Sequence, residues 1–401
     1  RREALMKVVM VGPFGLKPRG TMSRRALPLA KELAARGHQV EVVLPPWDCP
    51  EESGRCWEED GVSISNIALP SSVPFWGEAL ITGRLACEVL EAGPDIVHFF
   101  KPKGYAGAAA TLLWYLKKLG LVRARLVLDT DDWEGPGGWN EMGRYSSLQK
   151  RFFAWQEKWG LRHCDALTVA SSGLGRLALA MGVAEDRVLH VPNGTGSRDG
   201  PQLAGSETRA RSKWDLREGP AVLLYTRFFE FQPEAVVRVL RRVFDEEPSA
   251  RLLVVGKGLF GEEERFLSFV EEAGLGSRMV YAGWRDLSEL PDYFAAADLA
   301  ICPLEDNLLN RARCPAKIVD LMAAGVPVVA ENVGEVGQYI EHLCSGYLVA
   351  PGDADGFVAG VVRLMRDEPL RLALGRRARR RVRDNFSWSR LAEVVEGAYA
   401  G

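Results

Sequence analysis

The chain has 401 residues, a length that predicts two to three domains. Hydrophobic residues make up 47% of it and charged residues 26%, so it can bury a sizeable core and is not a disordered, collagenous or coiled-coil chain. The 51 basic and 53 acidic residues leave a net charge of −2, which argues against a nucleic-acid-binding protein held by bulk charge. Seven scattered cysteines without a C-x-x-C pair exclude a disulfide scaffold and a cysteine-based zinc site, and suit reduced cytosolic thiols.

The first residues, RREALMKVVMVGPFG, combine basic residues with a short apolar run. Its valines lead directly into Gly12 and Pro13 without a small-residue cleavage site, which favours a first core strand over a signal peptide. No window reaches 18 apolar residues without a charge, so we expect no transmembrane helix. We expect a cytoplasmic protein, and peripheral contact with the inner membrane face stays open.

Apolar runs alternate with segments of helical period through the first half of the chain. Residues 23–36 form an amphipathic pattern that Gly37 is placed to end as a C-cap. The predicted strands lie at 7–11, 39–44, 95–100, 125–129, 166–170 and 187–191. Strands separated by helices indicate βαβ units and a parallel sheet.

The composition changes near residues 193–219, where NGTGSRDG and PQLAGSE supply Gly and Ser without a long apolar run. The alternation then restarts, with strands predicted at 221–225, 251–255, 279–281, 299–302 and 326–330. We therefore predict a first Rossmann-like domain over 1–195, a linker over 196–218 and a second Rossmann-like domain over 219–385. Residues 386–401 are predicted to form an amphipathic helix that packs back on the first domain.

Ligands of open α/β sheets bind beyond the carboxyl ends of the strands. Two such domains that face each other would place these ends on the two sides of one cleft, so the loops after the strands are where we look for chemistry. The first of them, from Gly12 to Arg25, has glycines at the wrong spacing for G-x-G-x-x-G and no P-loop pattern. It is either an ordinary strand-to-helix loop or a ligand-facing one.

Charged residues follow two further predicted strands. Lys101 and Lys103 come just after 95–100, which suits a phosphate or carboxylate partner or simply two solvated lysines. The segment DTDDWEG, residues 129–135, is the strongest acidic cluster of the chain. It admits a metal clamp by Asp129 and Asp131, recognition or deprotonation of an acceptor hydroxyl by its acids, or plain helix capping.

The second half supplies two candidate cations. Arg227 directly follows the strand 221–225, and Lys317 begins a helix predicted over 316–324, with Pro315 at its start and Gly325 at its end. An anion at that helix N-terminus, between Lys317 and Arg227, would form a diphosphate site. The alternative is that Lys317 and Asp320 form an ordinary surface pair at i, i+3.

The sequence resembles the retaining glycosyltransferases of family four, which share the two-domain GT-B fold. The stretches that carry the resemblance are LHVPNGTG (189–196), SARLLVVGKG (249–258), VYAGWRDLSELPDYFAAADLAICP (280–303), KIVDLMAAGVPVVAENVGEVGQYI (317–340) and CSGYLVAPGDADGF (344–357), preceded by LAKELAARGHQVEVV and PDIVHFF in the first half. The resemblance implies transfer of a sugar from a nucleotide-diphosphate donor, bound mainly by the second domain, with retained anomeric configuration. It also implies that no metal and no cofactor besides the donor substrate are needed.

The resemblance, with the loops above, assigns roles to residues of this chain. The predicted catalytic residues are Arg227, Lys317, Asp131 and Asp132. The predicted donor-binding residues are Gly15, Gly256, Lys257, Gly283, Trp284, Asn310, Arg311, Arg313, Asp320, Gly334 and Glu335. The predicted acceptor-binding residues are Lys101, Lys103, Trp133 and Glu134, and no metal ligand is assigned.

Three positions depart from the family pattern. The Lys usual five residues after the phosphate-binding Arg is Gln232, and Arg311, Arg313 or Lys317 are candidates to replace it. The E-x7-E motif keeps only its second position, as Asp320, while its first falls on Ala312. The His often found near the sugar falls on Phe100, so His98 does not inherit that role and is read as a core residue.

Two other functions remain open at this stage: a nucleotide-sugar epimerase of the same fold, and a sugar-nucleotide-binding protein that has lost catalysis. The acceptor is a sugar, a lipid-linked or a small molecule, and the oligomeric state is not predicted. The segment SLQKRFFAWQEKWGLRHC mixes aromatic with basic residues. It is read either as core aromatics beside a solvated face or as a helix that rests on a membrane interface.

Overall fold

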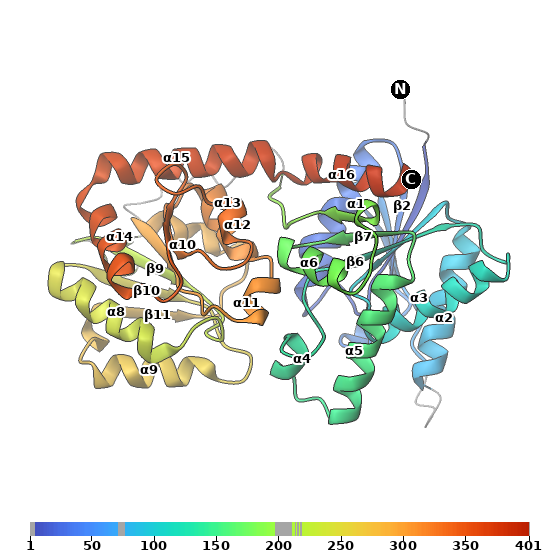
Figure 1. Ribbon diagram of the computed structural model, residues 1–401, viewed down its shortest axis with the longest axis horizontal. Helices are drawn as coiled ribbons and strands as arrows, with labels where there is room; N and C mark the ends of the chain where they lie inside the picture. The colour runs from blue at the N-terminus through green and yellow to red at the C-terminus, as the bar shows by residue number, and fades with distance from the viewer. Residues whose placement is uncertain are drawn as a thin grey trace. The chain divides into compact units, whose positions relative to one another are not determined.

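The structure, a computed structural model, describes residues 5–70, 77–196, 211, 212, 214, 216 and 219–400 (Figure 1). The chain divides into two compact units. The first consists of Arg1–Asn193, Ala312–Cys314 and Trp388–Gly401, and the second of Gly194–Arg311 and Pro315–Ser387. The predicted linker, 196–218, lies almost entirely outside the described residues. No helix within the described ranges is long and apolar enough to cross a membrane.

The first unit is built on a sheet that has eight strands within the described residues, in the order β3-β4-β2-β1-β5-β6-β7-β8. The strands are β1 (Lys7–Val11), β2 (Gln39–Leu44), β3 (Cys56–Glu59), β4 (Val62–Asn66), β5 (Ile96–Phe100), β6 (Arg125–Thr130), β7 (Ala166–Val169) and β8 (Val188–His190). All six strands predicted for the first half are present. The β3–β4 hairpin, the antiparallel pair of the sheet, was not predicted, because its strands are short and alternate polar with apolar residues at an edge.

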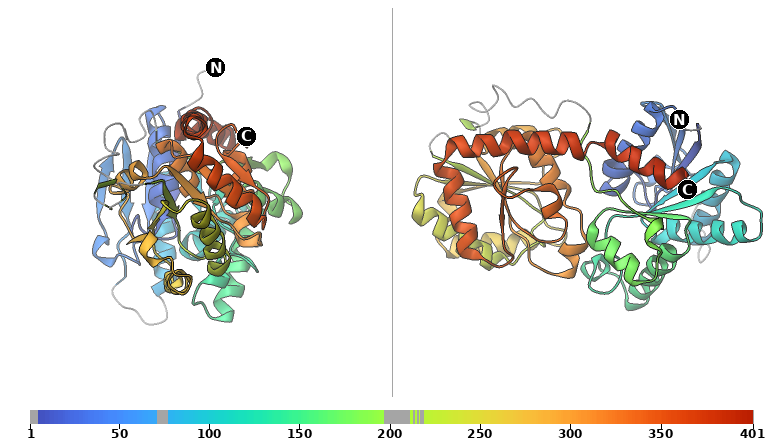
Figure 2. Two further views of the ribbon diagram at one scale, coloured as in Figure 1. Left: turned by 90° about the vertical axis from the view of Figure 1, so that its left-hand side faces the viewer. Right: turned by 45° about the horizontal axis from the view of Figure 1, so that its top comes forward.

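Helices cover both faces of this sheet (Figure 1). One face carries α1 (Leu27–Ala35) and α16 (Trp388–Ala400), which contact each other; the C-terminal helix runs beside the N-terminal part of the chain (Figure 2). Trp388, Leu391 and Val395 are buried there with the apolar side chains of α1. The other face carries α2 (Gly77–Ala92), α3 (Gly104–Lys118) and α5 (Ser147–Arg162). A π-helical turn, Met22–Ala26, precedes α1, so the predicted helix 23–36 exists with an irregular first turn. The shorter helices are α4 (Trp139–Met142) and α6 (Ser172–Ala180).

The second unit has a parallel sheet with six strands among the described residues, in the order β11-β10-β9-β12-β13-β14. They are β9 (Ala221–Tyr225), β10 (Arg251–Val255), β11 (Met279–Gly283), β12 (Leu299–Cys302), β13 (Val328–Glu331) and β14 (Tyr347–Val349). On one face pack α8 (Pro233–Glu246), α9 (Glu262–Glu272) and α14 (Ala354–Arg366), and on the other α10 (Leu290–Ala296), α12 (Ala316–Ala324) and α15 (Glu368–Asn385). Two short helices, α11 (Leu308–Ala312) and α13 (Val336–Tyr339), follow β12 and β13.

The helix α12 has the bounds that the sequence predicts. Pro315 is its N-cap, and Gly325 ends it in the left-handed conformation at φ +79°. The close packing of α12 on α15 depends on a second glycine, because a Cβ on Gly375 would lie 2.1 Å from the carbonyl oxygen of Gly325. These contacts fix where the N-terminus of α12 lies in the second unit.

Each sheet reverses its strand order once. In the first unit the reversal lies between β1 and β5, and in the second between β9 and β12. Open α/β sheets bind their ligands beyond the carboxyl ends of the strands at such a point. The loops after β1, β5 and β6 in the first unit, and after β9, β10 and β12 in the second, therefore lie where such a ligand would bind.

Candidate functional site

Five charged residues meet at the carboxyl ends of β5 and β6 in the first unit: Lys101, Lys103, Asp131, Asp132 and Glu134, hereafter the carboxylate cluster. The Nζ of Lys101 lies 3.3 Å from Asp131, 2.9 Å from Asp132 and 3.2 Å from Glu134. The Nζ of Lys103 lies 2.9 Å from the other oxygen of Glu134. Lys101 has a φ of +59°, which an L-residue rarely adopts, so its backbone is strained at this point. The predicted acceptor lysines and acids are thus brought together.

Burial and ion pairing shift the pKa values of Asp131 and Asp132 in opposite directions. Burial alone would lower the pKa of Lys101, but the three surrounding carboxylates raise it well above its usual value. Burial also opposes ionisation of Asp131, yet Lys101 and a hydrogen bond from Thr21 lower the pKa of Asp131 below its usual value. The pKa of Asp132 is raised, by burial first and by the charge of Asp131. Asp132 is therefore the more basic of the two neighbouring carboxylates.

A second, deeper network lies below the cluster. Arg25 binds Asp129 through both carboxylate oxygens, at 2.7 and 2.6 Å, and Thr168 donates to Asp129 at 2.6 Å. His98 contacts Thr168 at 3.2 Å and the hydroxyl of Tyr399 at 2.9 Å. Burial, with the Arg25 charge, lowers the pKa of His98 to about 3, so His98 is a neutral core residue, as predicted. Because Arg25 occupies both oxygens of Asp129, this arrangement does not present Asp129 and Asp131 as a joint metal clamp.

The π-helical turn before α1 connects the two networks. Thr21 donates to Asp131 at 2.7 Å, and Arg25 reaches Asp129 one turn later. Such turns often occur at functional sites. The sequence left this loop as either an ordinary strand-to-helix loop or a ligand-facing one, and it did not predict these two contacts. Gly15, predicted to bind the donor, donates its N–H to Asp48 at 3.2 Å, which ties this loop to the one after β2.

The buried face of α5 supports the same loops. Gln156 both accepts from and donates to the backbone of Gly104, at 2.9 and 3.0 Å. Glu157 accepts from Thr130 Oγ1 at 2.9 Å and from the backbone N–H of Glu134 at 3.3 Å. Burial, with the charge of Glu134, raises the pKa of Glu157 to about 8, so this carboxyl is protonated at neutral pH.

Trp133 does not stand open to solvent as an acceptor-binding ring would. It is 5% exposed, and its indole N–H donates to the carbonyl of Pro136 at 3.0 Å. Cβ atoms on Gly135 and Gly138 would lie 2.0 and 2.1 Å from atoms of Trp133. The tryptophan therefore stabilises the turn that carries Glu134, and its predicted contact with an acceptor stays a prediction.

In the second unit, Arg227 lies between the loops that follow β10 and β11. Its Nε donates to the carbonyl of Lys257 at 2.9 Å, and its guanidinium lies 5.3 Å from the ring of Trp284. The Gly256 N–H donates to the carbonyl of Gly283 at 2.8 Å. These five residues, all predicted catalytic or donor-binding, are thus brought together.

A buried carboxylate, Glu230, organises this loop, and sequence reasoning missed it. Glu230 accepts from Thr226 Oγ1 at 2.9 Å and from the Arg227 N–H at 3.0 Å, and it forms an ion pair with Lys317. It is 4% exposed. Asn310 donates to the carbonyls of Glu230 and Glu305, at 2.7 and 2.8 Å. A signal existed in the sequence, because Glu230 is the only acid in the aromatic run RFFEFQ directly after a strand.

The remaining predicted donor residues have other surroundings. Arg311 is exposed and binds Asp306 at 2.5 and 2.7 Å. Arg313 belongs to the first unit, where its charge opposes the rise in the pKa of Asp132. Asp320 lies one turn after Lys317 on α12 and is half-buried. These three assignments stay predictions.

The loop after β13 approaches α11 closely. Gly334 has a φ of +58°, and a Cβ there would lie 2.7 Å from the carbonyl oxygen of Asn310. Glu335, which follows it, is fully buried at the N-terminus of α13. Both residues therefore lie beside the segment that fixes Glu230, and their predicted contacts with a donor stay predictions.

Comparison with known proteins assigns both halves of the chain. Residues 20–194 match the family model of the glycosyl transferase 4-like domain, and residues 222–367 match that of glycosyl transferases group 1. An uncharacterized glycosyltransferase of Methanocaldococcus jannaschii is 23% identical over 98% of both chains. A GDP-mannose-dependent alpha-(1-6)-phosphatidylinositol monomannoside mannosyltransferase of Mycobacterium tuberculosis is 25% identical over 90% of this chain and 89% of its own.

Solved structures agree on the fold. Sucrose-phosphate synthase of Thermosynechococcus elongatus superposes with a TM-score of 0.73 at 20% identity, over 97% of each chain. Anabaena HepE, solved in complex with UDP and glucose, gives a TM-score of 0.71 at 18% identity, over 98% of each chain. Both units are therefore Rossmann-like domains of the GT-B fold, as predicted.

Proposed function

Because this chain belongs to the group 1 glycosyltransferases, we propose that it moves a sugar from a nucleotide-diphosphate sugar to an acceptor hydroxyl, with retention of the anomeric configuration. One observation carries the proposal: the cations Arg227 and Lys317 meet around one buried carboxylate, Glu230, at the reversal point of the second unit. Arginine and lysine side chains at such a point suit the pyrophosphate of the donor.

The proposed task of these cations is to stabilise the negative charge that develops as the nucleoside diphosphate departs. Fixed cations and a helix N-terminus do this without reorganisation during the reaction. The N-terminus of α12, next to Lys317, supplies the partial positive charge of a helix dipole. Among the candidates to replace the family lysine at Gln232, Lys317 is favoured because Glu230 links it to the Arg227 loop. Arg311 has its charge balanced by Asp306.

Names of related proteins agree with this donor class. HepE is also solved with UDP-glucose, and a starch synthase IV of Arabidopsis thaliana is solved with ADP and acarbose. The mycobacterial relative is GDP-mannose-dependent. The base therefore differs among proteins similar to this one, while a nucleoside diphosphate is common to them.

The acceptor hydroxyl is assigned to the carboxylate cluster of the first unit, with Asp132 as its hydrogen-bond acceptor because the pKa of Asp132 is raised. The acceptor oxygen forms a bond to the anomeric carbon on the face from which the bond to the diphosphate oxygen breaks. The hydroxyl proton passes to the leaving diphosphate, so the products are the glycoside and a protonated nucleoside diphosphate.

A thermal-shift panel of UDP-, GDP- and ADP-sugars tests the donor assignment, since only ligands that bind the native state raise its Tm. One of them is expected to raise the Tm of the wild-type chain but not that of Lys317→Ala. The positive donor is then incubated with candidate acceptors, and the anomeric proton of the product is read by NMR. Activity is expected to persist in excess EDTA. No shift with any nucleotide sugar, or an inverted product, would contradict the proposal.

A further inference from the structure

Helices α3 and α5 of the first unit carry large apolar side chains on their outer surface. Leu148, Phe152 and Trp155 of α5 are 78%, 48% and 49% exposed, and Tyr115 of α3 and Leu119 at its end are 53% and 73% exposed. We call these five residues, with the cations described below, the aromatic-basic face. The positions 148, 152 and 155 follow the helical spacing, so they form one stripe along α5.

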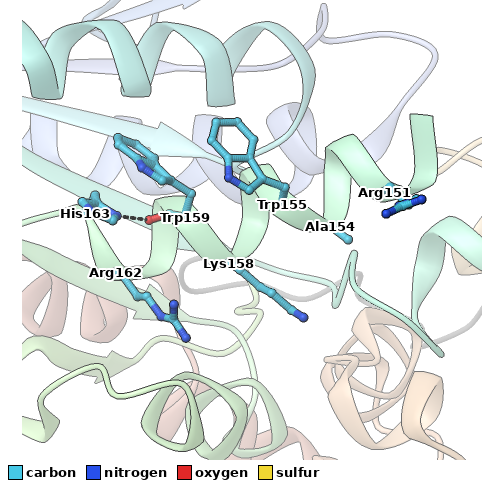
Figure 3. A pocket seen from close by; sticks show the side chains of 7 residues that line it. All are labelled: Arg151, Ala154, Trp155, Lys158, Trp159, Arg162 and His163. Carbon is cyan, nitrogen blue, oxygen red and sulfur yellow. Dashed lines mark hydrogen bonds between the residues drawn. The ribbon is translucent and has the colours of Figure 1, made fainter. Parts of the chain in front are cut away.

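The rings of this stripe are held by one another. Phe152 lies 5.9 Å from Trp155, Trp155 lies 6.2 Å from Trp159, and Trp159 stacks on His163 at 4.3 Å. Tyr115 joins the row from α3, at 6.1 Å from Trp159. A pocket of about 370 Å³ opens along the helix, with Trp155 and Trp159 in its wall (Figure 3). Such a row is a preformed surface that needs little ordering on contact with a partner.

Cations outnumber carboxylates on the two helices that carry these rings. Residues 103–128 contain no Asp or Glu, and the single acid of α5, Glu157, is fully buried on the opposite side of the helix. Arg151, Lys158 and Arg162 line the pocket (Figure 3). Within the described residues, no carboxylate pairs with Arg151 or Lys158. The surface therefore combines unneutralised cations with exposed aromatic rings.

We propose that the aromatic-basic face binds an anionic lipid bilayer. Aromatic rings favour the interface between water and hydrocarbon, while Lys and Arg bind the acidic headgroups. An amphipathic helix with this composition lies in the plane of the membrane surface. The second basic helix, α15, lacks this combination. Among its described residues, Leu372 is the large apolar side chain that is exposed, and the helix contains no aromatic residue beside Arg376, Arg377 and Arg380.

The opposite side of α5 contacts the loops that carry the carboxylate cluster. Gln156 and Glu157, on that side, bind Gly104, Thr130 and Glu134. A helix with its side chains is about 10–12 Å across, so the bilayer surface would lie about one helix diameter from the carboxylate cluster. If the bilayer lies this close to the carboxylate cluster, the acceptor hydroxyl belongs to a molecule held in the membrane. This assignment of the acceptor rests on the proposed function. Membrane binding itself does not depend on catalysis.

Vesicle flotation tests the proposal. The wild-type chain is expected to float with phosphatidylcholine vesicles that contain phosphatidylglycerol, to stay behind with pure phosphatidylcholine, and to be released by high salt. Each lost cation near the surface costs about fivefold in partitioning, from about 1 kcal/mol per Lys or Arg. Arg151→Glu with Lys158→Glu is therefore expected to weaken binding by about 25-fold or more. Phe152→Ser with Trp155→Ser is expected to weaken it in high and low salt alike.

The matched control is Arg376→Glu with Arg380→Glu in α15, which changes the net charge equally and is expected to leave flotation unchanged. Quenching of wild-type tryptophan fluorescence by brominated lipid in the same vesicles gives a readout that needs no variant. The donor-induced Tm shift is expected to be the same in all these proteins, which separates this test from that of the proposed function.

Three results would overturn the proposal. The first is absence of wild-type flotation and of quenching with phosphatidylglycerol vesicles. The second is an equal loss of binding in the α15 control, which would reduce the effect to bulk charge. The third is a dimer in sedimentation experiments that Phe152→Ser with Trp155→Ser dissociates, which would assign the face to a second copy of this chain.

Discussion

The two units place charged residues at equivalent points of their sheets but balance them differently. In the first unit, Lys101 and Lys103 are surrounded by Asp131, Asp132 and Glu134, and these side chains are between 0% and 21% exposed. In the second unit, Arg227 and Lys317 lie beside one buried carboxylate, Glu230, and Trp284 beside Arg227 is 57% exposed. The first site is closed, because its charged side chains are buried and paired with one another, whereas the second is partly open, with two cations beside one carboxylate.

The different arrangement of charges in the two sites favours a different kind of ligand in each. A network whose charges are already paired presents oriented hydrogen-bonding groups, which suit a neutral polyhydroxyl molecule without requiring an ion from it. An open group of cations has its strongest interaction with an anion that arrives from solvent. The comparison therefore supports an uncharged acceptor in the first unit and an anionic donor in the second. It also predicts that the same kind of substitution will affect stability in one site and catalysis in the other.

Lys101→Met is expected to have the largest effect, a loss of free energy of unfolding. This change leaves three buried carboxylates without their common partner, and removing one member of a buried ion pair costs about 3–5 kcal/mol. Urea denaturation measures the free energy of unfolding. The loss is expected to shrink as pH falls, because carboxyls left unpaired in the folded state have raised pKa values and regain stability once protonated. Lys117→Met is the control, since Lys117 pairs with Asp165 at the surface and is 28% exposed.

Arg227→Ala is expected to act on catalysis instead. Removing one fixed donor to a developing negative charge costs about 10²–10³-fold in rate, or about 2.7–4 kcal/mol. We expect a fall of this size in kcat/KM with the donor found in the thermal-shift panel, at a nearly unchanged Tm. Arg311→Ala, which removes a cation already paired with Asp306, is expected to change kcat/KM little. A fall in Tm instead of kcat/KM for Arg227→Ala would show that the second site is closed in the same way as the first.

Two glycines of the second site offer a matched test of its backbone. Gly256 has a φ of +131°, and a Cβ there would lie 1.8 Å from the carbonyl oxygen of Thr226. Gly256→Ala is therefore expected to cost about 2–4 kcal/mol of unfolding free energy and to displace the Arg227 loop. Gly283 also has a positive φ, +70°, but nothing lies within 4 Å of its Cβ position, so Gly283→Ala is expected to cost only about 1 kcal/mol. If the two substitutions lower the Tm equally, the positive φ of each glycine, and not the close approach of the Thr226 carbonyl to Gly256, determines the cost.

Local patterns were sufficient to predict most of the architecture. Apolar runs predicted the strands, and Pro315 and Gly325 predicted both ends of α12, because each acts through its own backbone geometry. The loops that carry Lys101 and Arg227 were found by the rule that strand ends carry the chemistry. The β3–β4 hairpin was missed because polar residues at an edge strand carry little periodic signal.

The partners of the site residues were not predictable in this way. Glu230 meets Lys317 across 87 residues, and Arg25 meets Asp129 across 104. Such pairs depend on strand order, which periodicity does not reveal. The burial of Glu157 was not predicted for a further reason, since an acid on an amphipathic helix is normally expected on the solvent face of that helix.

Glu157 gives a prediction whose effect builds up gradually with pH, and it tests how completely the first site is closed. Its folded-state pKa, about 8, lies above the usual value of 4.5 for a free Glu, so the folded chain binds one proton more than the unfolded chain between these values. This stability is fully present below about pH 4.5 and is lost as pH rises through 8, by up to about 1.4 kcal/mol per pH unit. Glu157→Gln is expected to remove this dependence.

The amide fits because its NH2 can donate to Thr130 Oγ1, whose own proton then goes to the carbonyl of Asp132 at 3.1 Å, while its oxygen accepts from the Glu134 N–H. The variant should match the wild type near pH 5 and exceed its Tm at pH 8. Glu141→Gln, at an exposed position that pairs with Lys150, should leave the pH profile of Tm unchanged. Parallel profiles for the wild type and Glu157→Gln would mean that this carboxyl is ionised in the folded chain, and that the first site holds four carboxylates against its two lysines.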